Sequence, residues 1–217
     1  MALTLAISSS VSNNRPTFTL VGGISETPER STAESTDAAV PDPLTLFEPD
    51  QLSIKDQQFV TAYRDGFTIL SKDNSCSRFY GGTSLDTLKV FNQMLTRFSK
   101  NYTDSKTGIE MSGGYSFYMN SENGFSYRLF AKGLINERGP FYKRKRFDSE
   151  ATVFGVGSFP PNTRKARVLM LLHELAHLIK GADGRWLIPD DGLDLYRSER
   201  NTELIEKRCG EYIKKLE

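Results

Sequence analysis

The two histidines of the chain, His173 and His177, stand four residues apart, and Glu174 directly follows the first. On an α-helix, positions i and i+4 lie one turn apart on the same face, so both imidazoles can direct a ring nitrogen at one metal ion. Glu174 is offset by about 100° around such a helix, where its carboxylate can reach a metal-bound water without being a ligand itself. Neutral imidazole suits Zn2+, and an open coordination position holds a water whose pKa falls to about 7. The spacing therefore predicts a catalytic zinc site.

The segment around this motif, residues 167–179, is apolar on nearly every side of the predicted helix. Such a pattern is typical of a helix buried within a domain. Burying two imidazoles and a carboxylate without partners would cost several kcal/mol. A metal ion and its water supply those partners, so burial favours a metal site over the alternative that two histidines merely share a helix.

This motif in a buried helix resembles the active-site helix of the zincin metallopeptidases. Residues 155–209 are also similar to an uncharacterised group of bacterial zincin-like proteins. The shared features are a glycine-containing strand at 156–159, the HExxH helix, an Ile-Pro-Asp loop at 188–191, and an Asn-Thr helix start at 201–202 that leads to Cys209. The resemblance implies that His173 and His177 bind zinc, that Glu174 is the general base, and that the strand before the helix binds extended substrate through its backbone.

A catalytic zinc ion usually has three protein ligands. The third is expected to be a downstream carboxylate, because the chain has no other histidine and its two cysteines are far apart. Asp191 follows the rigid Pro189 on a loop that must pass near the end of the helix, and the resembling group carries an acidic residue in this loop too. Glu206 lies at the rim of the buried side of the last helix. Asp191 is our first choice and Glu206 the second; the other acidic candidates are Asp183, Asp190, Asp194, Glu199 and Glu203.

Apolar periodicity places the motif among further helices and a small sheet. The central helix is predicted to begin at Asn162 and to end before Gly181, with a strand over 151–159 preceding it. Apolar residues at three- and four-residue spacing predict a helix over 85–98, and alternation around Asn123-Gly124 predicts a β-hairpin. The remaining expected elements are a helix over 53–71 capped by Ser53, a strand pair formed by 134–135 and 141–142, and a last helix over 198–216.

Composition bounds the class of protein. The 217 residues, 38% of them hydrophobic, suffice for one substantial core. Residues 1–43 are rich in Ser, Thr and Pro and are expected to form a disordered tail before a domain over 44–217. A net charge of +1 gives no global attraction to nucleic acid or anionic membranes, and the basic run 143–146 lacks interleaved aromatics, so a solvated loop or strand edge is expected there. No apolar run approaches the roughly 20 residues of a membrane-spanning helix.

The two cysteines, Cys76 and Cys209, leave two alternatives open. A disulfide between them would indicate an oxidising compartment, and then a secreted or periplasmic protein is expected. Two reduced thiols in the core would fit a cytoplasmic protein equally well.

These features predict an α+β, zincin-like metallopeptidase, with a small antiparallel or mixed sheet packed on the buried HExxH helix and with further helices. It is expected to hydrolyse peptides or proteins through a zinc-activated water, with Glu174 taking the proton of that water and passing it to the leaving amine. Tyr196 is a candidate second electrophile, with a surface or packing role as the alternative. Two rival functions remain: a binding or structural module that keeps the metal without turnover, and a metal-free domain in which the motif is incidental.

Overall fold

The computed structural model describes residues 49–82, 85–103, 108–145, 153–192 and 194–217. The chain divides into two units, Met1–Ala39 and Val40–Glu217, and every described residue belongs to the second. The predicted tail over 1–43 therefore lies outside the described residues. Among the residues that are described, no helix is both long and apolar enough to cross a membrane.

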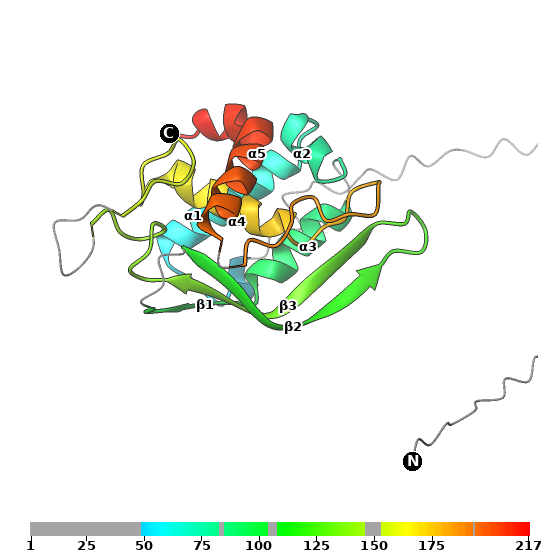
Figure 1. Ribbon diagram of the computed structural model, residues 1–217, viewed down its shortest axis with the longest axis horizontal. Helices are drawn as coiled ribbons and strands as arrows, with labels where there is room; N and C mark the ends of the chain where they lie inside the picture. The colour runs from blue at the N-terminus through cyan, green and yellow to red at the C-terminus, as the bar shows by residue number, and fades with distance from the viewer. Residues whose placement is uncertain (1–48, 83–84, 104–107, 146–152, 193) are drawn as a thin grey trace, which may run out of the picture. The chain divides into compact units, whose positions relative to one another are not determined.

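The second unit is an α+β structure, as predicted, in which helices gather on one side of a three-stranded sheet (Figure 1). The sheet has the order β1-β3-β2, with β1 parallel and β2 antiparallel to β3. The predicted hairpin is confirmed, because β2 and β3 pair over almost their whole length. The elements are the 3-10 turn η2 (Pro49–Gln51), α1 (Gln57–Leu70), α2 (Ser75–Phe79), α3 (Leu85–Leu95), β1 (Phe98–Asn101), β2 (Ile109–Met119), β3 (Ser126–Asn136), α4 (Arg164–Ala176) and α5 (Leu195–Lys214).

The central helix α4 is buried, as its sequence predicts. It packs between α1 and α5, and its apolar side chains are almost fully enclosed. The helix begins after Thr163 and not at Asn162, because the Thr163 hydroxyl accepts the N–H of Ala166 at 3.2 Å. Asn162 instead takes a left-handed backbone conformation, with φ of 56°. Since α4 ends at Ala176, the HExxH motif occupies its last turn and its C-cap.

The predicted strand over 151–159 is wrong. Its described part, from Val153 to Phe159, contains only an isolated bridge between Val156 and Phe159. Gly157 has φ of 55°, which turns the chain back on itself, and the Glu206 carboxylate accepts the backbone N–H of Ser158 at 2.9 Å. The glycines therefore serve a tight turn held by α5 and do not serve a strand.

Three other boundaries differ from the prediction. Ser53 does not cap α1, since its hydroxyl donates to the Phe98 carbonyl; Asp56 takes the cap and accepts the N–H of Phe59 at 2.9 Å. The proposed strand 141–142 is a turn whose Phe141 ring is fully buried. The last helix begins three residues early, at Leu195.

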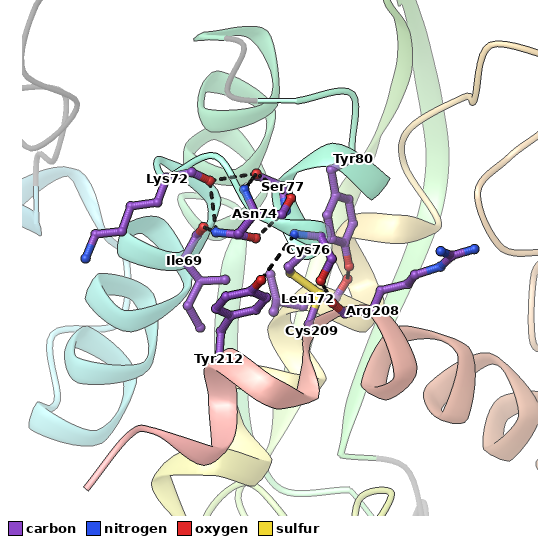
Figure 2. Close-up of a disulfide and its surroundings, with 11 residues drawn as sticks. Ile69, Lys72, Asn74, Cys76, Ser77, Tyr80, Leu172, Arg208, Cys209 and Tyr212 are labelled. Atoms are coloured by element: carbon purple, nitrogen blue, oxygen red, sulfur yellow. Dashed lines mark hydrogen bonds between the residues drawn. A yellow bond between two sulfur atoms is a disulfide. The ribbon is translucent and has the colours of Figure 1, made fainter.

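A disulfide joins Cys76 of α2 to Cys209 of α5 across 133 residues of sequence (Figure 2). Around it, the Ser75 hydroxyl donates to the Arg208 carbonyl at 2.8 Å. The buried Tyr80 hydroxyl donates to the Leu172 carbonyl of α4 at 2.6 Å. The short helix α2 thus connects α5 to the centre of α4.

Replacing both cysteines by serine, Cys76→Ser with Cys209→Ser, is expected to lower the free energy of unfolding by about 2–5 kcal/mol, because the cross-link restricts the unfolded chain over a long loop. Urea unfolding measures this difference. Wild-type protein should lose the same amount on addition of reductant, and the double variant should not respond to it. A double variant as stable as the oxidised wild type would contradict this role of the bridge.

Asp56 is expected to make stability depend on acid pH. Burial favours its neutral form, but hydrogen bonds from Phe59 N and the Tyr142 hydroxyl, together with the charge of Lys100, outweigh burial and hold the pKa of Asp56 below its usual value. Because the folded-state pKa is the lower one, the stability gained is complete above the unfolded value near 4 and is lost as pH falls through the folded value.

The matching variant is Asp56→Asn, which keeps a good N-cap and removes only the charge. At pH 7 it should cost about 1 kcal/mol, and the difference from wild type should shrink as pH falls below about 4. Urea unfolding between pH 7 and pH 3 measures the trend, with exposed Asp50→Asn as control. A cost that stays constant over this range would show that the Asp56 charge is not responsible.

Candidate metal centre

The two histidines lie side by side at the C-terminal end of α4. His173 is in the last turn and His177 is the C-cap, which retains right-handed helical backbone angles of φ −67° and ψ −19°. The i, i+4 relation therefore persists, and the two Nε2 atoms lie 3.0 Å apart. Both histidines are buried among described residues.

The loop after α4 brings Asp191 to the same point. Its Oδ2 lies 3.0 Å from His173 Nε2, and its Oδ1 lies 3.5 Å from His177 Nε2. One ligand atom from each of the three residues lies within 4.8 Å of both others, which makes the group able to hold a metal ion. The loop reaches this position because residues 178–180 run antiparallel to the start of β3, with Arg128 N donating to the Leu178 carbonyl at 2.8 Å.

Helix α5 holds two of these side chains in place. The Asn201 amide donates to Asp191 Oδ1 at 2.5 Å and to the Pro189 carbonyl at 2.8 Å. The single amide group of Asn201 thus fixes both the Asp191 carboxylate and the loop that carries it. Thr202 Oγ1 lies 3.0 Å from His173 Nδ1. When that nitrogen carries the proton and donates to the hydroxyl, His173 presents the lone pair of Nε2 toward the centre.

Arg128 of β3 fixes the other side of the centre. This buried side chain donates from Nε to the His177 carbonyl at 2.9 Å, and its guanidinium pairs with the Asp190 carboxylate through both terminal nitrogens, at 3.2 Å from Nη1. The Trp186 ring covers the guanidinium, with its centroid 4.2 Å from Cζ. Arg128 thus connects the sheet to the end of α4 and to the loop that carries Asp190 and Asp191, which we call the ligand loop.

The two carboxyl groups near the histidines, Asp191 and Glu174, have pKa values shifted in opposite directions. Burial works against ionisation of Asp191, but hydrogen bonds with His173 and His177 outweigh it and hold the pKa of Asp191 well below its usual value. For Glu174, burial raises the pKa to about 7, the His173 charge lowers it, and the Asp191 charge raises it. A divalent cation at the centre would lower the pKa of Glu174 and favour its carboxylate form.

The donor set fits a metal ion. Two imidazole nitrogens and a carboxylate oxygen lie 3.0–3.5 Å apart, and groups that mainly accept hydrogen bonds approach this closely only when a proton or a cation lies between them. One divalent cation can satisfy all three at once, whereas a single proton cannot. His177 Nδ1 is a buried atom without a hydrogen-bond partner among the described residues, and its nearest carboxylate oxygen is Asp190 Oδ1 at 3.9 Å. Nitrogen and oxygen donors of this type suit Zn2+.

The other acidic candidates have different tasks or positions. Glu206 is committed to Ser158, whose backbone N–H and hydroxyl both bond to its carboxylate. Asp190 is paired with Arg128, and Asp194 caps α5 by accepting the N–H of Arg197 at 3.2 Å. The remaining acidic candidates are exposed: Asp183, Glu199 and Glu203. Tyr196, the candidate second electrophile, is also exposed and ranks among the most exposed large side chains that the structure describes.

Sequence reasoning did not assign a role to Arg128, Asn201 or Thr202. The family resemblance predicts a helix start at Asn201 and Thr202. In the structure they lie in the second turn of α5 and contact Asp191 and His173. Arg128 lies in an alternating strand, and nothing in its local sequence distinguishes it from a surface arginine. Only the burial of Arg128 distinguishes it from a surface arginine, and this burial becomes visible only in the folded structure.

Comparison of the chain with models of known protein families, with curated proteins and with solved structures finds no match. The chemistry of the centre is therefore inferred from its own geometry and from the resemblance carried by the HExxH motif.

Zinc titration of metal-free protein is expected to show one tight site that depends on Asp191. Since loss of groups that only orient zinc ligands already costs about 10–100-fold in affinity, Asp191→Asn should weaken binding by at least about 100-fold. Glu206→Gln on α5 is the matched control and should bind zinc as the wild type does. The reverse order of effects, measured by competition with a chromogenic chelator, would make Glu206 the ligand.

Proposed function

We propose that this protein is a zinc-dependent peptidase of the zincin type, with His173, His177 and Asp191 as metal ligands. One observation carries the proposal: ligand atoms of two buried histidines and the half-buried Asp191 converge on one point, while Glu174, a carboxyl of near-neutral pKa, is next to His173 in the same helix. Groupings that combine a metal-ligand set with a perturbed carboxyl are typical of hydrolytic sites.

When bound, zinc would polarise a peptide carbonyl and lower the pKa of a water at its open coordination position. Glu174 supplies the proton transfers. The residue is half-buried. As carboxylate it accepts a proton from the attacking water, and as acid it donates that proton to the nitrogen of the leaving amine. A cation at the centre would lower the pKa of Glu174 from about 7, so the carboxylate that accepts the proton would be the form present at neutral pH.

The substrate strand of this proposal is β2, in place of the incorrectly predicted strand over 151–159. Among the described residues β2 pairs only with β3, so its outer edge presents unpaired backbone groups. Opposite this edge, β3 carries Arg128, which contacts the metal-binding helix. An extended peptide added to such an edge forms main-chain hydrogen bonds that do not depend on its sequence.

The disulfide supports a location for the proposed enzyme. Cys76 and Cys209 are both fully buried and bonded to each other. Structural disulfides persist in oxidising compartments. A secreted or periplasmic setting is therefore part of this proposal.

Glu174→Gln is expected to abolish peptide hydrolysis while zinc binding is retained. General acid–base catalysis contributes roughly 10²–10⁴-fold, so the rate on casein or a fluorogenic peptide library should fall by at least about 100-fold. Exposed Glu203→Gln is the control and should cleave at the wild-type rate. If zinc-loaded wild type cleaves nothing in the library, the protein is a metal-binding module and the proposal is wrong.

A further inference from the structure

One face of the β2–β3 hairpin carries bulky apolar side chains that are open to solvent. Tyr115, Phe117 and Met119 are 56%, 50% and 66% exposed. They alternate along β2 and therefore point to the same side of the sheet. The Trp186 ring from the ligand loop lies beside Phe117, with centroids 6.4 Å apart. We call these four residues the aromatic face.

The aromatic face is continuous with the metal centre through Arg128. Phe117 pairs with Arg128 across the hairpin, and the guanidinium lies 4.2 Å from the Trp186 centroid and 5.4 Å from that of Tyr115. The same guanidinium bonds to the His177 carbonyl and to Asp190. The aromatic face is therefore joined to the candidate metal centre through one buried side chain, Arg128.

The edge of β2 beside this face, beyond the irregularity between Ser112 and Tyr115, lacks charged residues and proline. Exposed edge strands normally carry charged residues or proline, which discourage the addition of another strand. From Tyr115 to Met119 the sequence is Tyr-Ser-Phe-Tyr-Met, with no charge and no proline. Exposed apolar surface of this kind marks an interaction site.

We propose that the aromatic face binds bulky apolar side chains at alternate positions of an extended peptide, the substrate of the proposed peptidase. The spacing fits, because residues i and i+2 of an extended chain are about 7 Å apart, as are Tyr115 and Phe117 on their own strand. The aromatic rings offer large contact area at low entropy cost. This inference rests on the proposed function for the identity of the occupant, since Arg128 joins the face to His177 and to the loop that carries Asp191.

Cations at the face exclude one alternative substrate chemistry. Lys180 Nζ lies 4.9 Å from the Phe117 centroid and 5.2 Å from that of Trp186. The rings are thus already occupied by cations of this chain. A lysine or arginine of the peptide would be repelled by Lys180, so apolar side chains are favoured over basic ones.

The test measures peptide binding in the Glu174→Gln background, where a bound peptide stays intact. Fluorescence anisotropy compares three labelled octapeptides that differ only at alternate positions, which carry Phe, Ser or Lys. The Phe peptide should bind at least about tenfold more tightly than the other two, since one buried Phe is worth roughly 1.5–3 kcal/mol. Adding Phe117→Ser should remove most of this preference.

Phe154→Ser is the matched control, because Phe154 is 70% exposed and does not belong to the aromatic face. It should leave the preference unchanged, and unchanged melting temperatures should show that both variants are folded. Equal binding of the three peptides, or a preference that survives Phe117→Ser, overturns the proposal. So does self-association of the protein that Phe117→Ser abolishes, because the face would then receive a second copy of the chain.

Wild-type cleavage of the same peptides separates this inference from the proposed function. Tight, Phe117-dependent binding without any cleavage would contradict the peptidase and keep the peptide-binding face. Cleavage that is equally fast for the Phe and Ser peptides would support the peptidase and reject the aromatic face as its determinant of specificity.

Discussion

Three groups that carry lone pairs, two buried imidazoles and one half-buried carboxylate, meet at the end of α4, and hydrogen bonds from α5 hold two of them together. Such a grouping is unfavourable unless something positive lies between its members. The fold nevertheless supports it from several directions: α4 provides the histidines, the following loop provides Asp191, and α5 orients both through Asn201 and Thr202. Without a cation between them, the close approach of these three groups would destabilise the folded state.

Two distant connections stabilise the frame around the centre. Arg128 links the sheet to the end of α4 and to the ligand loop, and its guanidinium is shielded by aromatic rings. The Cys76–Cys209 disulfide links α5 to α2, which in turn bonds to the backbone of α4 through Tyr80. The disulfide thus fixes the C-terminal half of α5 at Cys209, while Asn201 and Thr202 in its N-terminal half contact the candidate metal ligands.

The sequence contained much of this structure in its local patterns. Strong periodicity predicted the hairpin, the buried α4 and the helix α3, because a continuous apolar stripe or a strict alternation has few compatible structures. The predicted extension of α3 to Phe98 is wrong, since the helix ends at Leu95 and Phe98 begins β1. Local patterns failed where long-range contacts decide. The glycines at 155 and 157 read as a strand, but Glu206, some fifty residues later, holds them in a turn. Arg128 could not be recognised for the same reason, since its partners His177 and Asp190 lie 49 and 62 residues away.

Anomalous diffraction at the zinc edge from crystals of the zinc-loaded protein tests the central claim most directly. A single strong peak is expected at about 2.0–2.2 Å from Nε2 of His173, Nε2 of His177 and a carboxylate oxygen of Asp191. Glu174 should face the peak without contacting it. A peak bound by other carboxylates, or crystals in which the two imidazoles carry no zinc at all, would contradict the assignment of this site as a metal centre.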